Sequence, residues 1–138
     1  MTWPEIRHWE SRGMRCGAHT RTHAVLSLAD DALSAREIAH SWRRLNEEVR
    51  APSTVFCYPN GKPGDFGARE LATIRGLGMR AAVTATSGHC SPGRFAHDRF
   101  ALPRLSYIED GHAFLQLVGG LERAKDIARS MGAALPMP

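Results

Sequence analysis

The sequence of 138 residues has few cysteines, few aromatic residues and no long apolar run. Cys16, Cys57 and Cys90 are odd in number and form no Cys-x-x-Cys pair, which argues against a disulfide framework and a cysteine zinc site, so we expect buried free thiols. No apolar run approaches the about 18 residues of a membrane span, and the N-terminus lacks the apolar core of a secretory signal. The chain as written is expected to be soluble and cytoplasmic, whereas a full-length form could be exported.

The charge balance is basic, with a formal net charge of +4, but the arginines are scattered along the chain. No basic stripe is interleaved with aromatic residues, so nucleic-acid binding is not predicted. The hydrophobic content of 43% and charged content of 23% are those of a globular protein. We expect a single domain over residues 1–132, followed by a tail at 133–138.

The order of secondary-structure signals alternates between helix and strand. A helix is expected to begin at Thr2, where Glu5 completes a capping box, and to stop at Gly13. The period of apolar residues predicts further helices at residues 30–49, 68–77, 112–118 and 121–131. Short apolar or β-branched runs predict strands at residues 14–18, 54–58, 80–85 and 101–107, and the segment 86–99 is expected to be an irregular loop.

Alternating strands and helices predict a parallel sheet, in which the loops at the carboxyl ends of the strands build the active site. Three polar segments follow predicted strands: the histidine pair at residues 19–23, the turn at 58–61, and the loop at 86–99. We therefore expect these three segments to lie on one rim of the sheet.

His19 and His23 are four residues apart, a spacing that lets two imidazoles bind one metal ion. A catalytic zinc usually takes three protein ligands and a water, so the pair would be part of a site. The alternative is a pair of ordinary surface histidines. The other His, Cys and Asp side chains in the long loop do not have a usual zinc spacing and are expected to be structural: His89, Cys90, His97 and Asp98.

Three motifs in order give a resemblance to a known family. They are His-Thr-Arg-Thr-His at residues 19–23, Phe-Cys-Tyr-Pro-Asn-Gly at 56–61, and Phe-Ala-Leu-Pro-Arg at 100–104. With them the chain resembles the polysaccharide deacetylases of carbohydrate esterase family 4, in the branch with a Tyr-Pro-x-Gly turn. The resemblance implies an α/β fold, namely a partial (β/α) barrel of the polysaccharide deacetylase type that lacks the first strands.

The resemblance also implies a function and a metal site. It implies a metal-dependent hydrolase that removes acetyl groups from N-acetylated, or O-acetylated, polysaccharide. His19 and His23 would bind a divalent metal, most commonly zinc in this family. The backbone N–H of Asn60 would face the developing oxyanion, and the turn residues Tyr58, Pro59 and Gly61 would contact the substrate.

Two further residues are assigned by comparison with the family pattern. Many members have an arginine two residues before the proline of the turn, where this chain has Cys57, and Arg104 is the candidate to supply that charge. A late histidine in a Leu-x-His sequence stabilises the leaving group in many members. No such sequence follows Arg104, and His112 is the candidate for that role.

The first motif of the family, a strand ending in Thr-Phe-Asp-Asp, supplies the catalytic base and the metal's aspartate upstream of the histidine pair. This chain begins at Met1, after the place of that motif, so we expect an N-terminally truncated domain. Its open sheet edge would be covered by the missing segment or by a partner chain. The alternative to an enzyme is a non-catalytic remnant of the same fold that binds a metal or a glycan.

Overall fold

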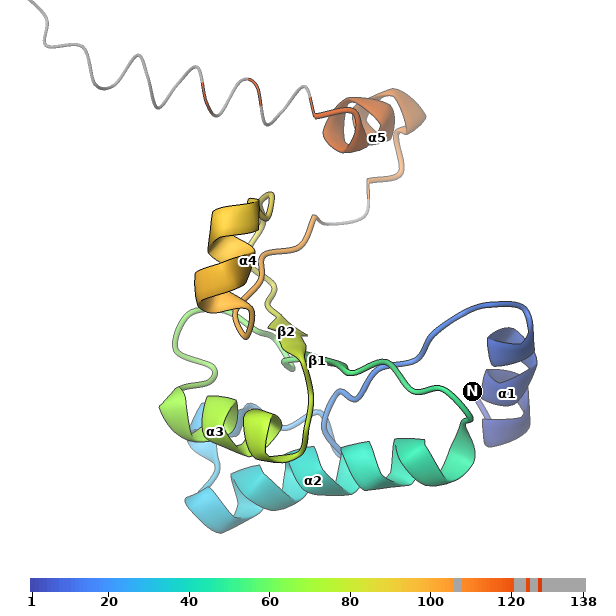
Figure 1. Ribbon diagram of the computed structural model, residues 1–138, viewed down its shortest axis with the longest axis vertical. Coiled ribbons are helices and arrows are strands. Elements are labelled where there is room, and N and C mark those ends of the chain that lie inside the picture. Colours follow the sequence, from blue (N-terminus) through green and yellow to red (C-terminus); the bar gives the residue numbers. More distant parts are fainter. Residues whose placement is uncertain (106–107, 121–123, 125–126, 128–138) are drawn as a thin grey trace, which may run out of the picture. The chain divides into compact units, whose positions relative to one another are not determined.

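The computed structural model of the chain describes residues 1–105, 108–120, 124 and 127 (Figure 1). It divides into two compact units, Met1–Arg104 and Leu105–Pro138. The elements of the first unit are α1 (Trp3–Ser11), the 3-10 helix η1 (Leu26–Leu28), α2 (Asp31–Glu48), β1 (Val55–Cys57), α3 (Ala68–Gly76), β2 (Ala81–Val83) and α4 (Pro92–Asp98). The second unit contains α5 (Gly111–Val118).

The strands of the first unit run parallel, which confirms the predicted α/β class. β1 pairs with β2 in the register Val55 to Ala81. Two isolated parallel bridges, Gly17 to Ser53 and Val83 to Leu102, extend this pair on either side. Four segments therefore lie side by side, in the order of the segment at Gly17, β1, β2 and the segment at Leu102.

The two outer segments are shorter than the strands predicted at residues 14–18 and 101–107. Each has a single bridge among the described residues, and beyond Leu102 the next donor, the Arg104 N–H, donates to the carbonyl of Thr86, which lies outside β2. Residues 106–107 lie outside the described part of the chain. A partial barrel remains a prediction, because the described strands give a parallel arrangement without closing it.

The predicted helices of the first unit are confirmed, and their ends follow from local capping. The Glu5 carboxylate accepts hydrogen bonds from the N–H and the hydroxyl of Thr2, so the predicted capping box forms at α1. Asp30 caps α2 by accepting from the Leu33 N–H at 2.7 Å. These caps occupy N–H groups that a helix cannot pair internally.

The prediction of an irregular loop over residues 86–99 is wrong in its second half, where α4 forms. Pro92 begins this helix, and its fixed φ and missing N–H suit the first turn. The N–H of Phe95 donates to the carbonyl of Ser91 at 2.9 Å, which closes that turn. Pro92 and Gly93 were interpreted as signs of a loop, but both residues are also compatible with the first turn of a helix.

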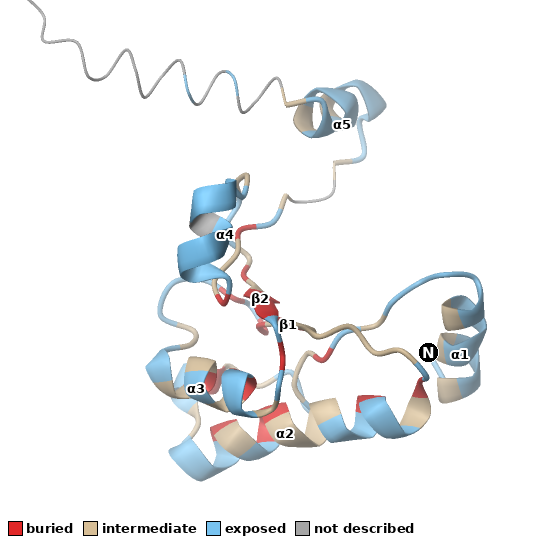
Figure 2. Ribbon diagram, viewed as in Figure 1, coloured by how far each residue is buried: buried red, intermediate tan, exposed pale blue. Residues whose placement is uncertain are grey.

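The core of the first unit lies between the strands and the buried sides of α2 and α3 (Figure 2). Phe56 and Tyr58 point to the same side of β1 because they are two residues apart, and both are fully buried. Tyr58 also stacks on Phe66, with ring centroids 3.8 Å apart. Burying a side chain of this size contributes about 1.5–3 kcal/mol, so these rings anchor β1 to the helices.

A buried carboxylate joins α2 to α3. Glu70 accepts hydrogen bonds from the Ser34 hydroxyl at 2.6 Å, the Arg69 guanidinium at 2.6 Å and the Gly67 N–H at 2.8 Å. Burial by itself would raise the pKa of Glu70, but these three donors together outweigh it and the pKa is lowered. Glu70 therefore fixes the contact between α2 and α3 as a charged group.

In the second unit, α5 confirms the helix predicted at residues 112–118, and Asp110 caps it by accepting from the Ala113 N–H at 2.7 Å. Of the helix predicted at 121–131, only Ala124 and Ile127 are described, and both are helical. The tail at 133–138 lies outside the described residues. No helix in the described part of the chain is long and apolar enough to cross a membrane.

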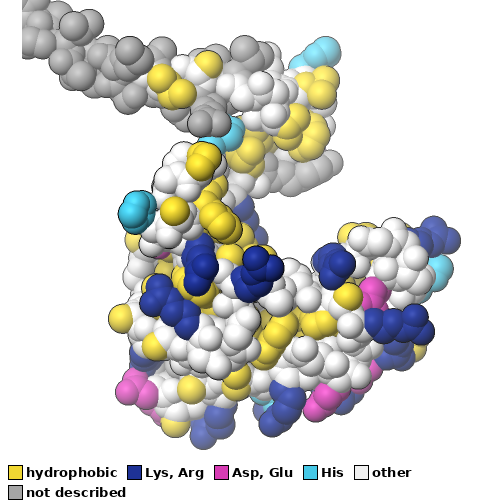
Figure 3. Space-filling model, viewed as in Figure 1, with side chains coloured by type: hydrophobic (Ala, Val, Ile, Leu, Met, Phe, Trp, Pro, Cys, Tyr) yellow, Lys and Arg dark blue, Asp and Glu magenta, His cyan; other side chains and the backbone are white. Residues whose placement is uncertain are grey.

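The three cysteines are free. Cys16 and Cys57 are half-buried, whereas Cys90 is exposed, so the expectation of buried thiols is wrong for Cys90. Figure 3 shows Lys and Arg side chains at several separate places on its face of the first unit. On that face, the basic charge is spread as the sequence indicates.

Candidate active site

The carboxyl ends of the four parallel segments meet at one rim. Nδ1 of His19, after the first segment, lies 2.7 Å from the carbonyl oxygen of Cys57 at the end of β1. The Ala85 N–H, after β2, donates to the carbonyl of Gly61 at 2.9 Å. The Arg104 N–H, after the fourth segment, donates to the carbonyl of Thr86 at 3.0 Å. Neighbouring segments are therefore joined at their carboxyl ends, and the histidine segment contacts the end of β1.

The histidine loop, defined as residues 19–23, brings its two imidazoles together. The ring centroids of His19 and His23 are 4.8 Å apart, with the rings at 78°. Thr20 and His23 have φ values of 61° and 60°, in the left-handed region that costs a residue with a Cβ about 1–2 kcal/mol. Strain of this kind persists only where surrounding contacts hold the backbone.

Those contacts come from α2. The N–H groups of Arg21 and Thr22 both donate to one carboxylate oxygen of Glu37, at 2.9 and 2.8 Å. Glu37 itself is only 5% exposed. The carboxylate thus occupies two consecutive backbone donors between the two histidines.

The hydrogen bond at His19 determines which of its ring nitrogens is available. A carbonyl oxygen only accepts, so Nδ1 of His19 must carry the proton that it donates to Cys57. Nε2 of the neutral ring then has a free lone pair. This is the arrangement in which a protein holds a metal-ligating histidine, with the second nitrogen fixed by a backbone carbonyl.

The two histidines fit part of a metal site. The described residues contain no group of three or more His, Cys, Asp and Glu side chains that could hold a metal ion. The metal site is therefore not completed by the His, Cys and Asp side chains of the segment at residues 86–99, which are His89, Cys90, His97 and Asp98. Next to His19, the hydroxyl oxygen of Thr20 is buried and has no hydrogen-bond partner among the described residues.

The turn after β1 leaves a backbone donor free. The Gly61 N–H donates to the carbonyl of Pro59 at 2.6 Å, closing a three-residue turn around Asn60, whose φ is 55°. Within the described chain the Asn60 N–H has no acceptor, and Asn60 is exposed. A Cβ at position 61 would lie 2.8 Å from the Ala85 nitrogen, so the turn requires glycine there.

The remaining residues of this turn are buried. The Tyr58 hydroxyl donates to the carbonyl of Phe100 at 3.0 Å, and burial raises the pKa of this phenol well above its usual value. Pro59 and Gly61 are buried as well. The Tyr58 side chain therefore packs in the core. A role of Tyr58, Pro59 and Gly61 in substrate binding remains a prediction, and with these residues buried it would involve the backbone of the turn.

Arg104 lies beside Cys57, the position at which the resemblance implies an arginine in many family members. Its Nη1 lies 3.4 Å from Sγ of Cys57, a residue 47 positions earlier in the chain. The guanidinium is thus placed beside β1 at the rim, while Arg104 as a whole is exposed. His112 belongs to α5 in the second unit, and its role remains a prediction.

Sequence reasoning missed Glu37, although a signal was present. In the helix predicted at residues 30–49, Glu37 is four residues after Leu33 and next to Ile38, so it falls on the apolar side. A charged residue at such a position needs hydrogen-bond partners when it is buried. The partners, Arg21 and Thr22, were not identifiable from the helix pattern.

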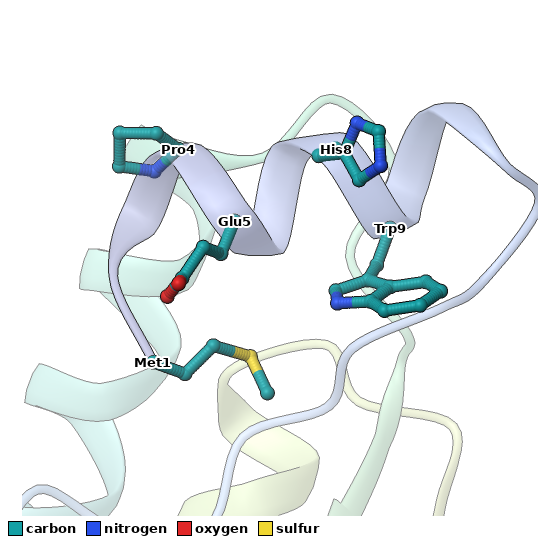
Figure 4. Close-up of a pocket in the computed structure, with 5 residues that line it drawn as sticks. All are labelled: Met1, Pro4, Glu5, His8 and Trp9. Carbon is teal, nitrogen blue, oxygen red and sulfur yellow. The ribbon is translucent and has the colours of Figure 1, made fainter.

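Two of the hollows that adjoin the N-terminal part of the chain contain a histidine. One, of about 340 Å³, runs along residues 16–21 between Trp3 and Ile6 of α1 and Leu45 of α2, and includes His19. The other, of about 670 Å³, is formed by Met1 and side chains of α1 such as His8 (Figure 4). The Glu5 carboxylate there accepts the Thr2 N–H at 2.6 Å, which holds it at the start of α1.

Comparisons with known proteins show a family and a similar fold. The family model described as polysaccharide deacetylase matches residues 1–82. The chain is also similar to the solved structure of the Streptococcus pyogenes deacetylase PplD in complex with acetate, with a TM-score of 0.70 and 21% sequence identity. That match covers 80% of this chain but 46% of the other, so this chain spans less than half of that protein, and the likeness concerns the fold. No curated protein matches the chain.

Proposed function

This chain belongs to the polysaccharide deacetylase family, and on that premise we propose that it acts in the metal-dependent removal of acetyl groups from a polysaccharide. The acetyl groups are N-linked or O-linked ones on the sugar. The observation that carries the proposal is the histidine pair at a strand end, where the carbonyl of Cys57 leaves Nε2 of His19 free. A pair of ordinary surface histidines would not need this fixed tautomer.

His19 and His23 would hold a divalent metal, with zinc the first choice for two imidazole ligands. When bound, the metal supplies Lewis-acid polarisation of the acetyl carbonyl and of a water molecule. The protein's own contribution at this point is orientation. Cys57 fixes the His19 ring, and Glu37 fixes the backbone between the two histidines.

Asn60 contributes its backbone N–H. The tight turn closed by Gly61 exposes this N–H at the rim, where it can donate to the oxyanion that forms when water attacks the acetyl carbon. A preorganised donor of this kind is worth about a hundredfold to a thousandfold in rate. The Asn60 side chain is not needed for this role.

Arg104 supplies positive charge to the same rim. Its guanidinium lies beside the Cys57 thiol, where many family members place an arginine side chain directly on the strand. The charge therefore reaches the same region from the fourth segment. A cation in this position stabilises negative charge that develops on the substrate or on a neighbouring carboxylate.

The sheet edge at Gly17 has backbone groups available to pair with a further segment. The carbonyls of Cys16 and Ala18 accept from Ser53 and Cys57 of the β1 side, while the N–H and C=O of Gly17 have no partner among the described residues. The hollow of about 340 Å³ lies along this edge. We propose that a preceding segment of the protein or a partner chain covers it and supplies the remaining metal ligand and the base.

A second function follows from the same observations. The described residues would offer a metal only the two imidazoles, with no carboxylate grouped with them. A chain with only these groups would bind a metal or a glycan without hydrolysing it. The enzyme and the non-catalytic binder predict the same metal content but different acetate release.

The experiment measures zinc content and acetate release from N-acetylated oligosaccharides for the wild type, His19→Ala and His23→Ala. His8→Ala, an exposed histidine on α1, is the matched control. Zinc binding lost in both site variants, together with acetate release by the wild type, supports the enzyme. Zinc binding without acetate release supports the binder, and unchanged zinc content in both site variants overturns the ligand assignment.

A further inference from the structure

We propose that Glu37 is the positioning residue of the histidine loop, and that its carboxylate holds His19 and His23 in the geometry that a metal requires. The inference rests on the proposed function, because it assigns a task to a residue that supports the metal ligands. Glu37 does not itself join the two imidazoles in a metal-binding group. Its effect on the metal is therefore exerted through the backbone.

The first argument is the position of the contact. Oε2 of Glu37 accepts from the N–H groups of Arg21 and Thr22, and these two residues lie between the two histidines. Hydrogen bonds to a charged acceptor are stronger than those between neutral groups. One oxygen thus fixes two consecutive peptide groups in the middle of the loop.

The second argument is the conformation of the loop. Thr20 and His23, on either side of the anchored pair, both have φ near +60°. A residue with a Cβ disfavours this conformation, so the free loop would relax to other arrangements. The Glu37 carboxylate is a contact from outside the loop that opposes this relaxation.

The third argument is the electrostatic state of Glu37. It is 5% exposed on α2, and no Lys, Arg or His of the described chain forms a salt bridge with it. A buried carboxylate needs donors to offset its lost hydration. The two loop N–H groups are the donors that it has, so the carboxylate and the loop stabilise each other.

Glu70 offers a matched control. It is the other buried glutamate of the described residues, it also accepts a backbone N–H, and it joins α2 to α3 without contacting the histidine loop. Loss of either carboxylate should lower stability. Only the loss of Glu37 should change the affinity of the folded protein for zinc.

The test measures the zinc dissociation constant of the full chain for the wild type, Glu37→Ala, Glu37→Gln and Glu70→Gln, under conditions where circular dichroism shows each to be folded. We expect Glu37→Ala to weaken zinc binding about tenfold to a hundredfold, which is the usual cost of losing a residue that orients a ligand. Glu37→Gln keeps an acceptor oxygen and should fall between. Glu70→Gln should stay within about twofold of the wild type.

A second readout needs no metal. Amide hydrogen exchange at Arg21 and Thr22 should accelerate at least about tenfold in Glu37→Gln and remain unchanged in Glu70→Gln. If the wild type binds no zinc, the proposed function fails, while the exchange rates still decide whether Glu37 holds the loop. Wild-type exchange at both amides in Glu37→Gln, or equal zinc losses in Glu37→Gln and Glu70→Gln, would overturn the proposal.

Discussion

Nδ1 of His19 lies 2.7 Å from the carbonyl oxygen of Cys57, a residue 38 positions further along the chain. This contact crosses from the first parallel segment to β1, and it determines the tautomer of the ring. We predict that the neutral His19 ring is protonated at Nδ1 and not at Nε2 at about pH 8. Nitrogen-15 chemical shifts of the imidazole measure this directly.

Addition of zinc provides the control for that measurement. The Nε2 resonance of His19 should shift on zinc binding, while the Nδ1 resonance should keep the shift of a protonated nitrogen. An Nε2-protonated ring in the metal-free protein would contradict the hydrogen bond and remove the lone pair on which the metal assignment depends.

Arg104→Ala should lower acetate release about tenfold to a hundredfold, because the rim loses the cation beside Cys57. Zinc affinity should be unchanged, since Arg104 carries no metal ligand. Steady-state acetate release and a zinc titration on the same preparations measure the two quantities.

The double variant Cys57→Arg with Arg104→Ala tests whether charge at that place is the cause. If it is, moving the guanidinium to position 57 should restore part of the acetate release lost in the single variant. No restoration in a folded double variant, or full activity of Arg104→Ala alone, would argue against the role of Arg104.

Gly61→Ala should destabilise the protein strongly. The new Cβ would lie 2.8 Å from the Ala85 backbone nitrogen, and Gly61 has a φ of 66°. We expect the free energy of unfolding to fall by about 2–4 kcal/mol, from the conformational cost and the steric clash together.

Gly64→Ala is the matched control, because Gly64 has a φ of 96° but nothing within 4 Å of its Cβ position. It should cost only about 1–2 kcal/mol, from conformation alone. Urea unfolding measures both. Equal losses in the two variants would show that close contact with Ala85 does not matter.

Tyr58→Phe should change how the stability of the protein depends on pH in the alkaline range. Burial, and after it the charge of Glu70, raises the pKa of the Tyr58 phenol, so the unfolded chain loses this proton at lower pH than the folded one. The contribution of Tyr58 to stability is therefore complete below about pH 10 and is lost as the pH rises above it. The variant, which cannot ionise there, should lose less stability than the wild type over this range.

Near neutral pH the same variant should cost about 1 kcal/mol, because the hydrogen bond to the Phe100 carbonyl is missing. Urea unfolding at about pH 8 and pH 11 gives both quantities. If the wild type and Tyr58→Phe lose the same stability between these two pH values, burial does not protect Tyr58 from ionisation.

Local pattern was sufficient for α1, α2 and α3 and for the order of the strands. The caps at Thr2 and Asp30 depend on residues three positions away, and both were readable as residue types. The segment at residues 92–98 was misjudged because Pro92 is compatible both with a loop and with the first turn of a helix.

By itself, the sequence determined the parallel α/β order, the histidine pair at a strand end and the glycine turn that follows β1. These features depend on neighbours within a few positions and on the alternation of apolar residues. Only the tertiary structure decided that Cys57 fixes the His19 ring, that Glu37 anchors the histidine loop, and that Arg104 reaches the Cys57 thiol. Those contacts join residues 15 to 47 positions apart, and the packing of strands and helices, which no local pattern encodes, brings them together.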